Sequence, residues 1–234
     1  MIKIAILAGG LATRLLPITE TIPKALVKIA GKPFILHQLN YLKHQGINQI
    51  VLCIGHLGHK IRELVGNGEN FGLQVVYSED GPGLLGTGGA IMKALPKLGK
   101  QFFIIYGDSF LPIDFLKVYQ AFSTSKKQAL MTVLRNNDQW DKSNVIFTNG
   151  ELIEYNKFRP SPKMSYIDYG LSVIDSSVLK KDIKKKSFDL AETFQDLSFD
   201  GHLAGFEVYE RFYEIGSQNG FKETENYFLT KEKA

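Results

Sequence analysis

Apolar and polar positions follow two alternating periods along the first 135 residues. Nearly continuous apolar runs such as those within residues 2–8 (IKIAILA) and 101–107 (QFFIIYG) are typical of strands covered on both faces. Between such runs, apolar residues recur every three or four positions, as at Ile35, Leu39 and Leu42, which predicts amphipathic helices. Strands alternating with helices indicate βαβ units and a mostly parallel sheet. The strands expected are 2–8, 49–54, 73–79, 101–107 and 128–135, and the helices expected are 33–46, 57–66, 86–98 and 112–125.

The pattern changes after Arg135. Residues 143–158 predict a hairpin around Asn149-Gly150, a strong turn dipeptide. The remaining elements expected are a strand at 166–175, a helix at 188–201, one or two strands within 203–216 and a helix at 217–229. We therefore predict an α/β fold with a Rossmann-like, mixed but mostly parallel central sheet flanked by helices. One domain is expected over residues 1–234, with the second half serving as a substrate lobe.

Composition narrows the class of protein. The 234 residues are 44% hydrophobic and 22% charged, which is ordinary for a soluble globular protein, and the net charge of +4 is too small to indicate nucleic acid as a partner. Cys53 is the lone cysteine and cannot form an internal disulfide, which favours a reducing compartment. No signal-peptide pattern and no apolar run near 20 residues is seen. We expect a cytoplasmic protein with no membrane partner, and self-association is left open.

The stretch AILAGGLATRLLPITETIPKAL at residues 5–26 gathers glycines, hydroxyls and cations directly after the first strand, where parallel sheets bind ligands. Gly9 and Gly10 allow a ligand to approach backbone N–H groups. Arg14 offers a fork of donors that suits phosphate oxygens, and Lys24 offers a mobile positive charge. The pattern GxxxxGK[ST] is absent, and GxGxxG does not follow this strand. The stretch therefore predicts an anion site that holds phosphate in another way.

A second glycine cluster, LLGTGGA at residues 84–90, opens a predicted helix. Helix N-termini favour negative charge, and each glycine costs a helix roughly 1 kcal/mol relative to alanine, so this cluster predicts close approach of a ligand. Thr87 could cap the same helix. Asp108 follows a strand, and a carboxylate beside phosphate-binding cations is a natural ligand for Mg²⁺. A glycine-rich helix start and an ordinary turn aspartate stay open as purely structural interpretations.

Together the motifs GGLATRLLPITETIPK, LGTGGA and GDS resemble the sugar-1-phosphate nucleotidyltransferases, also called sugar-nucleotide pyrophosphorylases. The likeness covers nearly the whole chain. It is similar to short bacterial members such as the heptose 1-phosphate guanylyltransferases and the N-acetylmuramate 1-phosphate uridylyltransferase. The resemblance implies the nucleotide-diphospho-sugar transferase fold, with nucleoside triphosphate bound by about residues 1–135 and sugar 1-phosphate bound by a small lobe of about residues 136–234.

The resemblance also implies roles for single residues. Arg14 and Lys24 would contact the nucleotide phosphates at the reacting centre, and Lys157 would hold the sugar phosphate. The implied nucleotide-binding set is Leu7, Ala8, Gly9, Gly10, Thr13, Arg14, Lys24, Glu79, Gly86, Thr87, Gly88 and Asp108. The implied sugar-binding set is Tyr106, Asn144, Asn156, Lys157, Tyr169 and Gly170. The implied ligands of Mg²⁺ are Asp108 and Glu214.

Three positions depart from the family pattern. Ala12 stands where the family usually has glycine, Asn156 where many members have glutamate, and Glu214 where aspartate is commoner. None of these changes removes a cation or the first expected metal ligand, so we expect an active enzyme.

The implied reaction is a Mg²⁺-dependent in-line attack of a sugar 1-phosphate on the α-phosphorus of a nucleoside triphosphate, which gives an NDP-sugar and diphosphate. The product would supply activated sugar for cell-surface polysaccharide or glycan synthesis. An inactive sugar-nucleotide-binding regulator of the same fold stays open as an alternative, although Arg14, Lys24 and Asp108 are all present. A dinucleotide-dependent oxidoreductase is disfavoured by the first loop. Neither the base nor the sugar is indicated.

Overall fold

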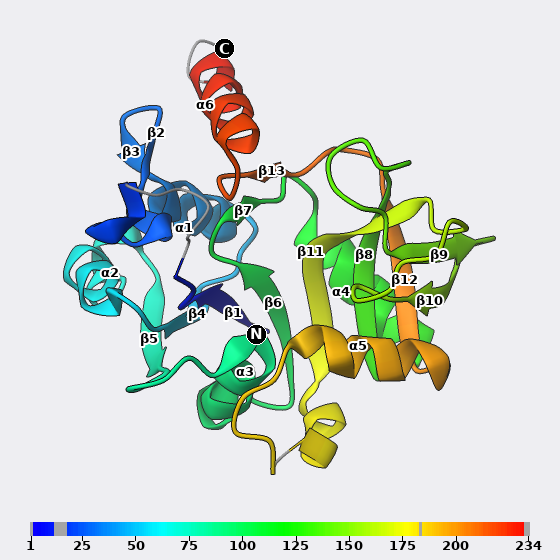
Figure 1. Ribbon diagram of the computed structural model, residues 1–234. Helices are drawn as coiled ribbons and strands as arrows, with labels where there is room; N and C mark the ends of the chain where they lie inside the picture. The colour runs from blue at the N-terminus through cyan, green and yellow to red at the C-terminus, as the bar shows by residue number, and fades with distance from the viewer. Residues whose placement is uncertain (1, 12–17, 183, 232–234) are drawn as a thin grey trace.

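A central nine-stranded sheet organises the computed structural model, which describes residues 2–11, 18–182 and 184–231 (Figure 1). Strand β1 lies between β4 and β6, and β4 pairs with β5, all in parallel. These four strands confirm the expected parallel first half. Their bounds are Lys3–Ala8 for β1, Gln49–Ile54 for β4, Gln74–Glu79 for β5 and Gln101–Tyr106 for β6.

The second half continues the same sheet through β11 (Tyr166–Asp175), which pairs antiparallel with β6 and with β8. Strand β8 in turn pairs parallel with β12. The predicted hairpin is present, and both residues of its turn, Asn149 and Gly150, have the positive φ values that this dipeptide tolerates. The other bounds are Ala129–Arg135 for β8, Val145–Thr148 for β9, Glu151–Tyr155 for β10 and Leu203–Val208 for β12.

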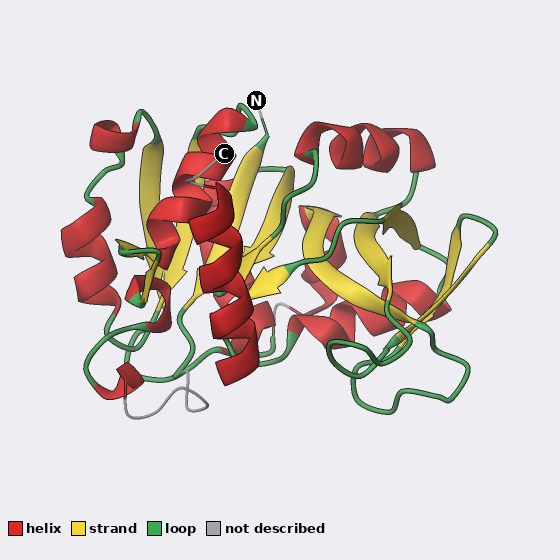
Figure 2. Ribbon diagram, turned by 90° about the horizontal axis from the view of Figure 1, so that it is seen from above, coloured by secondary structure: helices red, strands yellow, loops and turns green. Residues whose placement is uncertain are grey.

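Helices cover both faces of the sheet (Figure 2). The helix expected from residue 112 begins at Phe115, because the Asp114 side chain caps it by accepting a bond from the Lys117 amide. No helix in the described ranges is both long and apolar enough to cross a membrane. The helices are α1 (Phe34–His44), α2 (Gly58–Val65), α3 (Gly86–Leu98), α4 (Phe115–Ser125), α5 (Leu190–Phe199) and α6 (Gln218–Lys231).

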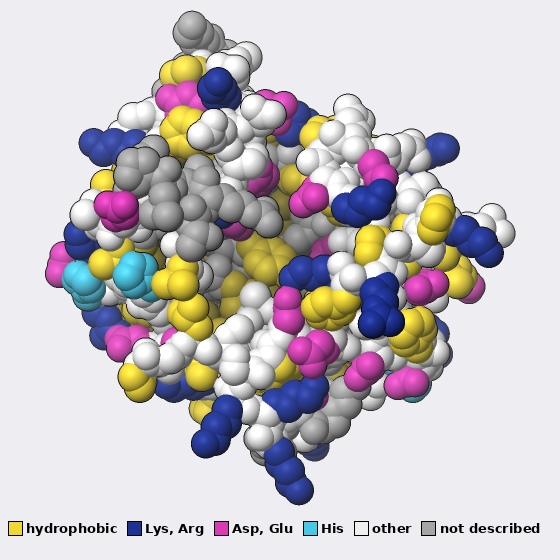
Figure 3. Space-filling model, in the orientation of Figure 1, with side chains coloured by type: hydrophobic (Ala, Val, Ile, Leu, Met, Phe, Trp, Pro, Cys, Tyr) yellow, Lys and Arg dark blue, Asp and Glu magenta, His cyan; other side chains and the backbone are white. Residues whose placement is uncertain are grey.

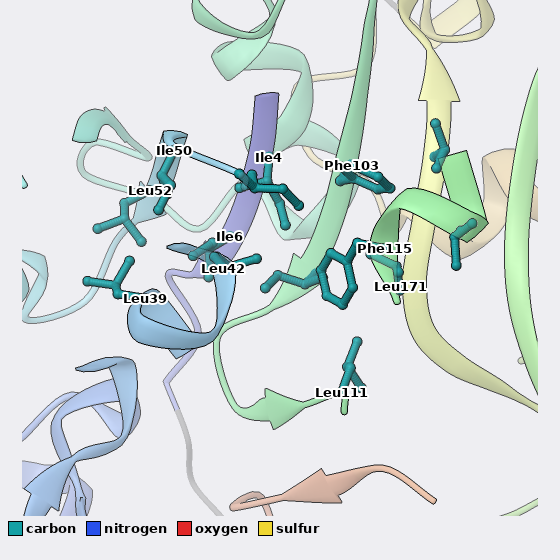
Figure 4. Packing of buried hydrophobic residues seen from close by; sticks show 14 of the residues in the cluster. Ile4, Ile6, Leu39, Leu42, Ile50, Leu52, Phe103, Leu111, Phe115 and Leu171 are labelled. Carbon is teal, nitrogen blue, oxygen red and sulfur yellow. The ribbon is translucent and has the colours of Figure 1, made fainter. Parts of the chain in front are cut away.

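Two hydrophobic cores lie on opposite faces of the sheet. Successive side chains of a strand point to opposite faces, so Ile4 and Ile6 of β1 join one core while Ala5 joins the other. The first core packs against α1 and α4, and Figure 4 shows Leu39 and Phe115 of those helices directed at β1 and its neighbours. The second core packs against α3 and α5. This two-sided burial explains the nearly continuous apolar runs.

Two additional sheets have strands of only two residues. β2 (Lys28–Ile29) pairs with β3 (Lys32–Pro33), and β7 (Ser109–Phe110) pairs antiparallel with β13 (Tyr213–Glu214). The β7–β13 pair leads the chain into α6, which stands above the first half of the molecule (Figure 1). Strands this short show no period in the sequence.

The glycines that open α3 allow the segment before α5 to dock. The backbone N–H of Gly88 donates to the Phe188 carbonyl over 3.0 Å, and the Phe188 N–H donates to the Leu85 carbonyl over 3.1 Å. A Cβ on Gly88 would overlap the buried Phe188 ring, and a Cβ on Gly86, whose φ is +69°, would overlap the Phe188 carbonyl. The absence of a side chain at these two glycines therefore allows the two halves of the chain to pack closely together.

We predict that Gly88→Ala lowers the free energy of unfolding by roughly 1–3 kcal/mol, as overpacked core sites do. Because alanine has a higher helix propensity than glycine, propensity alone would raise the free energy of unfolding by about 1 kcal/mol. Gly83→Ala is the matched control, because nothing lies within 4 Å of its Cβ position. Denaturant unfolding measures both, and equal stability of the two variants would contradict this docking role.

Candidate functional site

A pocket of about 250 Å³ opens at the carboxyl ends of β1 and β6 and beside the start of α3. Figure 3 shows a hollow with a largely hydrophobic floor between the two halves of this face. Pockets at this edge of a parallel sheet are the usual ligand sites of such folds. The lining residues are Leu7, Ala8, Gly9, Gly10, Lys24, Ala25, Cys53, Asp80, Leu84, Gly86, Thr87, Ala90, Tyr106, Gly107 and Asp108.

The pocket brings together most of the predicted nucleotide-binding residues from separate loops. Among the predicted residues, Gly88 lies behind the pocket against Phe188, as described above. Thr13 and Arg14 lie outside the described residues, as does Ala12.

Asp80 occupies the part of the pocket for which the sequence predicted Glu79. The side chain of Glu79 is exposed and forms an ion pair with Arg62, and it does not line the pocket. Asp80 is 8% exposed, and its Oδ2 is 3.2 Å from the position of a Cβ on Gly9. Burial raises the pKa of Asp80, while the Leu85 N–H and Lys93 oppose that rise. Asp80 is thus a functional candidate that the sequence interpretation missed by one residue.

Lys24 and Asp108 meet at the edge of the pocket. The Lys24 Nζ lies 2.6 Å from Asp108 Oδ2, and both side chains are partly exposed, at 20% and 33%. The Ser109 hydroxyl donates to the other carboxylate oxygen over 3.2 Å. Lys24 begins the 3₁₀-helix η3 (Lys24–Leu26), and Asp108 follows β6 by two residues, so the predicted pairing of these motifs in space is present.

Glu214 approaches Asp108 because β13 pairs with β7. This pairing sets Glu214 opposite Ser109, and the Ile215 N–H donates to the Asp108 carbonyl over 2.9 Å. A Cβ on Gly216 would stand 2.6 Å from Glu214 Oε2, 2.8 Å from Lys24 Nζ and 3.5 Å from Asp108 Oδ2. The two predicted metal ligands therefore face one small region, which the Lys24 ammonium also reaches.

The carboxylate of Glu214 also caps helix α6. It accepts bonds from the Gly216 N–H, from the Ser217 N–H over 3.1 Å and from the Ser217 hydroxyl over 2.5 Å. An acidic residue at a helix N-terminus is favoured for this purpose alone. Since a carboxylate has about four acceptor positions, the cap leaves capacity for a further partner.

A second group of polar residues lies beside the pocket in the second half. The Nζ of Lys157 is 2.7 Å from Asp189 Oδ2, and the Thr87 hydroxyl donates to Asp189 Oδ1 over 2.9 Å. Burial alone would raise the pKa of Asp189, but hydrogen bonds from Lys157 and the Ala191 N–H lower it. Asp189 thus links a residue predicted for the nucleotide with a residue predicted for the sugar phosphate.

A bulge in β11 positions Asp168 near this group. The register of β11 shifts between Asp168 and Ser172, and Gly170 has a φ of +103°. Asp168 Oδ1 accepts the Gly170 N–H over 2.9 Å, and the Asp168 N–H donates to Asn144 Oδ1, also over 2.9 Å. Burial raises the pKa of Asp168 to about 6, against opposing effects of the Gly170 N–H and Lys157.

Lys157 and Asn144 contact Asp189 and Asp168 as described above, and the other predicted sugar-binding residues fall in three places. Tyr106 lines the pocket, and its ring is 3.7 Å from the position of a Cβ on Gly170. Both residues therefore lie between the pocket and the polar residues of the second half. Asn156 is turned toward its own loop, where its side chain accepts the N–H groups of residues 158 and 159. Tyr169 lies in the core at 2% exposure, and its hydroxyl donates to the Arg211 carbonyl over 3.4 Å. Its neighbour Asp168, missed by the sequence interpretation, is the polar side chain near Lys157.

The chain is similar in sequence to one known protein family and to several of its members. The family model described as nucleotidyl transferase matches residues 3–205. The N-acetylmuramate alpha-1-phosphate uridylyltransferase of Neisseria meningitidis is 41% identical over 123 residues, which cover 52% of this chain and 53% of that protein. The chain therefore matches only about half the length of that relative. The D-glycero-alpha-D-manno-heptose 1-phosphate guanylyltransferase of Campylobacter jejuni is 30% identical over 82% of this chain and 84% of its own.

Solved structures share the fold. The crystal structure of HddC from Yersinia pseudotuberculosis has a TM-score of 0.82 at 24% identity and covers 97% of this chain and 100% of its own. The structure of the same protein complexed with GMP-PN has a TM-score of 0.79 at 25% identity, with the same coverage of both chains. These likenesses confirm the predicted fold class.

The raised pKa of Asp168 predicts a pH-dependent cost in stability. A carboxyl group with a folded pKa of about 6 and an unfolded value near 4 stabilises the fold only while protonated, so its contribution is full below pH 4 and lost as the pH rises through 6. We expect Asp168→Asn to stabilise the protein at pH 8 by roughly 1–2 kcal/mol relative to the parent, with a smaller difference at pH 5.

Denaturant unfolding at both pH values measures this difference. Asp138→Asn is the control of opposite sign, because hydrogen bonds from Lys142 and Ser143 lower the pKa of Asp138 to about 2. That variant should lose stability on the alkaline side. An Asp168→Asn variant that is less stable than the parent at pH 8 would contradict the assignment.

Proposed function

The chain belongs to the nucleotidyl transferase family, and we propose that it transfers a nucleotidyl group from a nucleoside triphosphate to a sugar 1-phosphate, with release of diphosphate. The observation that carries this proposal is that two lysines, one from each half of the chain, are both connected to the pocket. Lys24 borders the glycine-lined pocket, and Lys157 borders the adjoining group in the second half, linked to the pocket through Asp189 and Thr87. Two phosphate-bearing substrates can therefore meet between them.

The proposed reaction needs charge compensation rather than a general base. A sugar phosphate oxygen is already an anion when it attacks the α-phosphorus, but like charges about 4 Å apart repel by roughly 4 kcal/mol at an effective dielectric of 20. Lys24 would offset this repulsion on the nucleotide side and Lys157 on the sugar side. Arg14 is proposed to add bidentate donors to the nucleotide phosphates. Catalysis then consists of positioning and electrostatic stabilisation.

Asp108 and Glu214 fit a Mg²⁺ ion by their chemistry and their placement. Mg²⁺ takes one or two carboxylates and completes its shell with phosphate and water, so the absence of any group of three His, Cys, Asp or Glu among the described residues is compatible with it. The Lys24 ammonium beside Asp108 supports the choice of this carboxylate as the partner of a cation. When bound there, Mg²⁺ would neutralise charge on the triphosphate, while Lys24 would move from the carboxylate to a phosphate oxygen.

The sugar is proposed to lie against Asp168 and Asp189. Both carboxylates flank Lys157, and both can accept bonds from hydroxyl groups. Asn156 stands where many family members have glutamate, but its side-chain oxygen accepts a backbone N–H of its own turn. We therefore propose that the two aspartates accept the hydrogen bonds of the sugar hydroxyls instead. The product would be an activated sugar for cell-surface polysaccharide or glycan synthesis in the cytoplasm. The Neisseria and Campylobacter relatives are named for uridylyl and guanylyl transfer, which makes UTP and GTP the first nucleotides to test.

We expect diphosphate release when the protein is given Mg²⁺, a suitable nucleoside triphosphate and a sugar 1-phosphate. The measurement is a matrix of GTP, UTP, CTP, dTTP and ATP against hexose, N-acetylmuramate and heptose 1-phosphates. Each positive well is verified by mass spectrometry of the NDP-sugar. Binding of sugar nucleotides without turnover in any well would support an inactive regulator instead.

We expect Lys24→Ala and Lys157→Ala to damage different steps. Lys24→Ala should lower kcat about 10²-fold, as loss of a preorganised donor does. Lys157→Ala should raise KM for the sugar 1-phosphate by about 10-fold or more, the cost of a charge-assisted hydrogen bond, with nucleotide affinity by calorimetry little changed.

Lys142→Ala is the matched control for both variants, since Lys142 also pairs with an aspartate, Asp138, but on an exposed loop. Its kinetics should equal those of the parent. If Lys157→Ala weakens nucleotide binding as much as sugar phosphate binding, the division of roles is wrong.

A further inference from the structure

Gln38 is a buried polar residue on an otherwise apolar face of α1. Its neighbours on that face, Ile35, Leu39 and Leu42, belong to the hydrophobic core, and Gln38 itself is 3% exposed. Its Nε2 donates to the Tyr106 carbonyl over 2.9 Å and to the Ser109 carbonyl over 2.6 Å. Its Oε1 has no hydrogen-bond partner in the part of the chain that the structure describes.

Burying the unpaired Oε1 of Gln38 costs free energy that packing of the helix does not require. A buried polar atom without a partner costs roughly 1–3 kcal/mol, and an apolar side chain of the same size would avoid that cost. Both amide hydrogens are used on carbonyl oxygens, which can only accept, so the orientation of the amide is determined by its two partners. A buried polar group of this kind indicates a role beyond stability.

The two carbonyls that Gln38 holds flank the turn that carries Asp108. Tyr106 ends β6 and Ser109 begins β7, so the amide fastens the turn on both sides of Gly107 and Asp108. The turn is tightly confined, because a Cβ on Gly107 would lie 2.9 Å from the Ala8 Cβ. From the other direction, the Ile215 N–H donates to the Asp108 carbonyl.

We propose that Gln38 is a positioning residue for Asp108, and that it sets the affinity of this carboxylate for a divalent cation by fixing the 106–109 turn. The proposal rests on the proposed function for the presence of a metal at Asp108. Gln38 does not reach the substrates itself, since it is buried beneath the turn and does not line the pocket. Its effect should therefore fall on metal binding and leave sugar recognition unchanged.

The test replaces Gln38 by an apolar residue of similar length. Gln38→Met removes both donors while filling the same space. The matched control is Gln45→Met directly after the same helix, because Gln45 also bonds a backbone group, the Phe115 N–H over 3.0 Å, but that group begins α4 and lies outside the 106–109 turn. Binding of Mn²⁺ is measured by electron paramagnetic resonance, first alone and then with inorganic diphosphate.

We expect Gln38→Met to weaken Mn²⁺ binding about 10-fold, the lower range for residues that support metal ligands, while Gln45→Met binds as the parent does. In turnover, Gln38→Met should need about 10-fold more Mg²⁺ for half-maximal rate and regain most of its rate at saturation. Its KM for the sugar 1-phosphate should stay unchanged. Parent-like Mn²⁺ binding in Gln38→Met, or an equal loss in both variants, would overturn the proposal.

A measurement on the unaltered protein covers the case in which Gln38→Met does not fold. The side-chain amide resonance of Gln38 should shift when Mg²⁺ and diphosphate bind, and that of Gln45 should not; a static Gln38 signal would overturn the proposal. The positioning role of Gln38 and the proposed reaction can fail independently of each other. If no substrate pair turns over but Mn²⁺ binding is weakened only in Gln38→Met, the positioning role stands and the assigned reaction fails.

Discussion

Strand β6 is the element on which the arrangement of the whole molecule depends. It pairs parallel with β1 on one side and antiparallel with β11 on the other, so the two halves of the sheet are joined through it. Its last residue, Tyr106, lines the pocket and lies close to Gly170 in the second half, and Asp108 follows two residues later. A single strand therefore determines how far the two lysine-bearing regions stand apart, and that distance limits which pairs of phosphates can react.

Both lysines are neutralised by a carboxylate in the structure. Lys24 is paired with Asp108 and Lys157 with Asp189, and each pair is partly exposed. Such pairs contribute little to stability, typically below 1 kcal/mol, because water screens them. Under the proposed function, replacing either carboxylate by a phosphate oxygen would therefore cost the fold little stability.

The longer elements were predictable from sequence because each buries a continuous face, and the strand and helix periods of the first half follow from that burial. One or two strands were expected within residues 203–216, and β13 lies in that range, but its partner β7 was not predicted, since no period fits in so short a span, yet this pair brings Glu214 to Asp108. The structure also offers a neighbouring aspartate beside two of the predicted site residues, Asp80 next to Glu79 and Asp168 next to Tyr169. The β11 bulge directs Asp168 rather than Tyr169 toward Lys157, and a register shift of this kind leaves no compositional trace.

The shared partner Asp189 makes the two substrate regions thermodynamically dependent on each other. Its carboxylate accepts a bond from the Thr87 hydroxyl beside the pocket and lies 2.7 Å from the Lys157 ammonium in the second half. A ligand that draws Lys157 away alters the charge felt by Thr87. By thermodynamic linkage, if one ligand changes the affinity of the second by some factor, the second ligand changes the affinity of the first by the same factor. Under the proposed function, the mutual effect of the two substrates on each other's affinity would pass through this one aspartate.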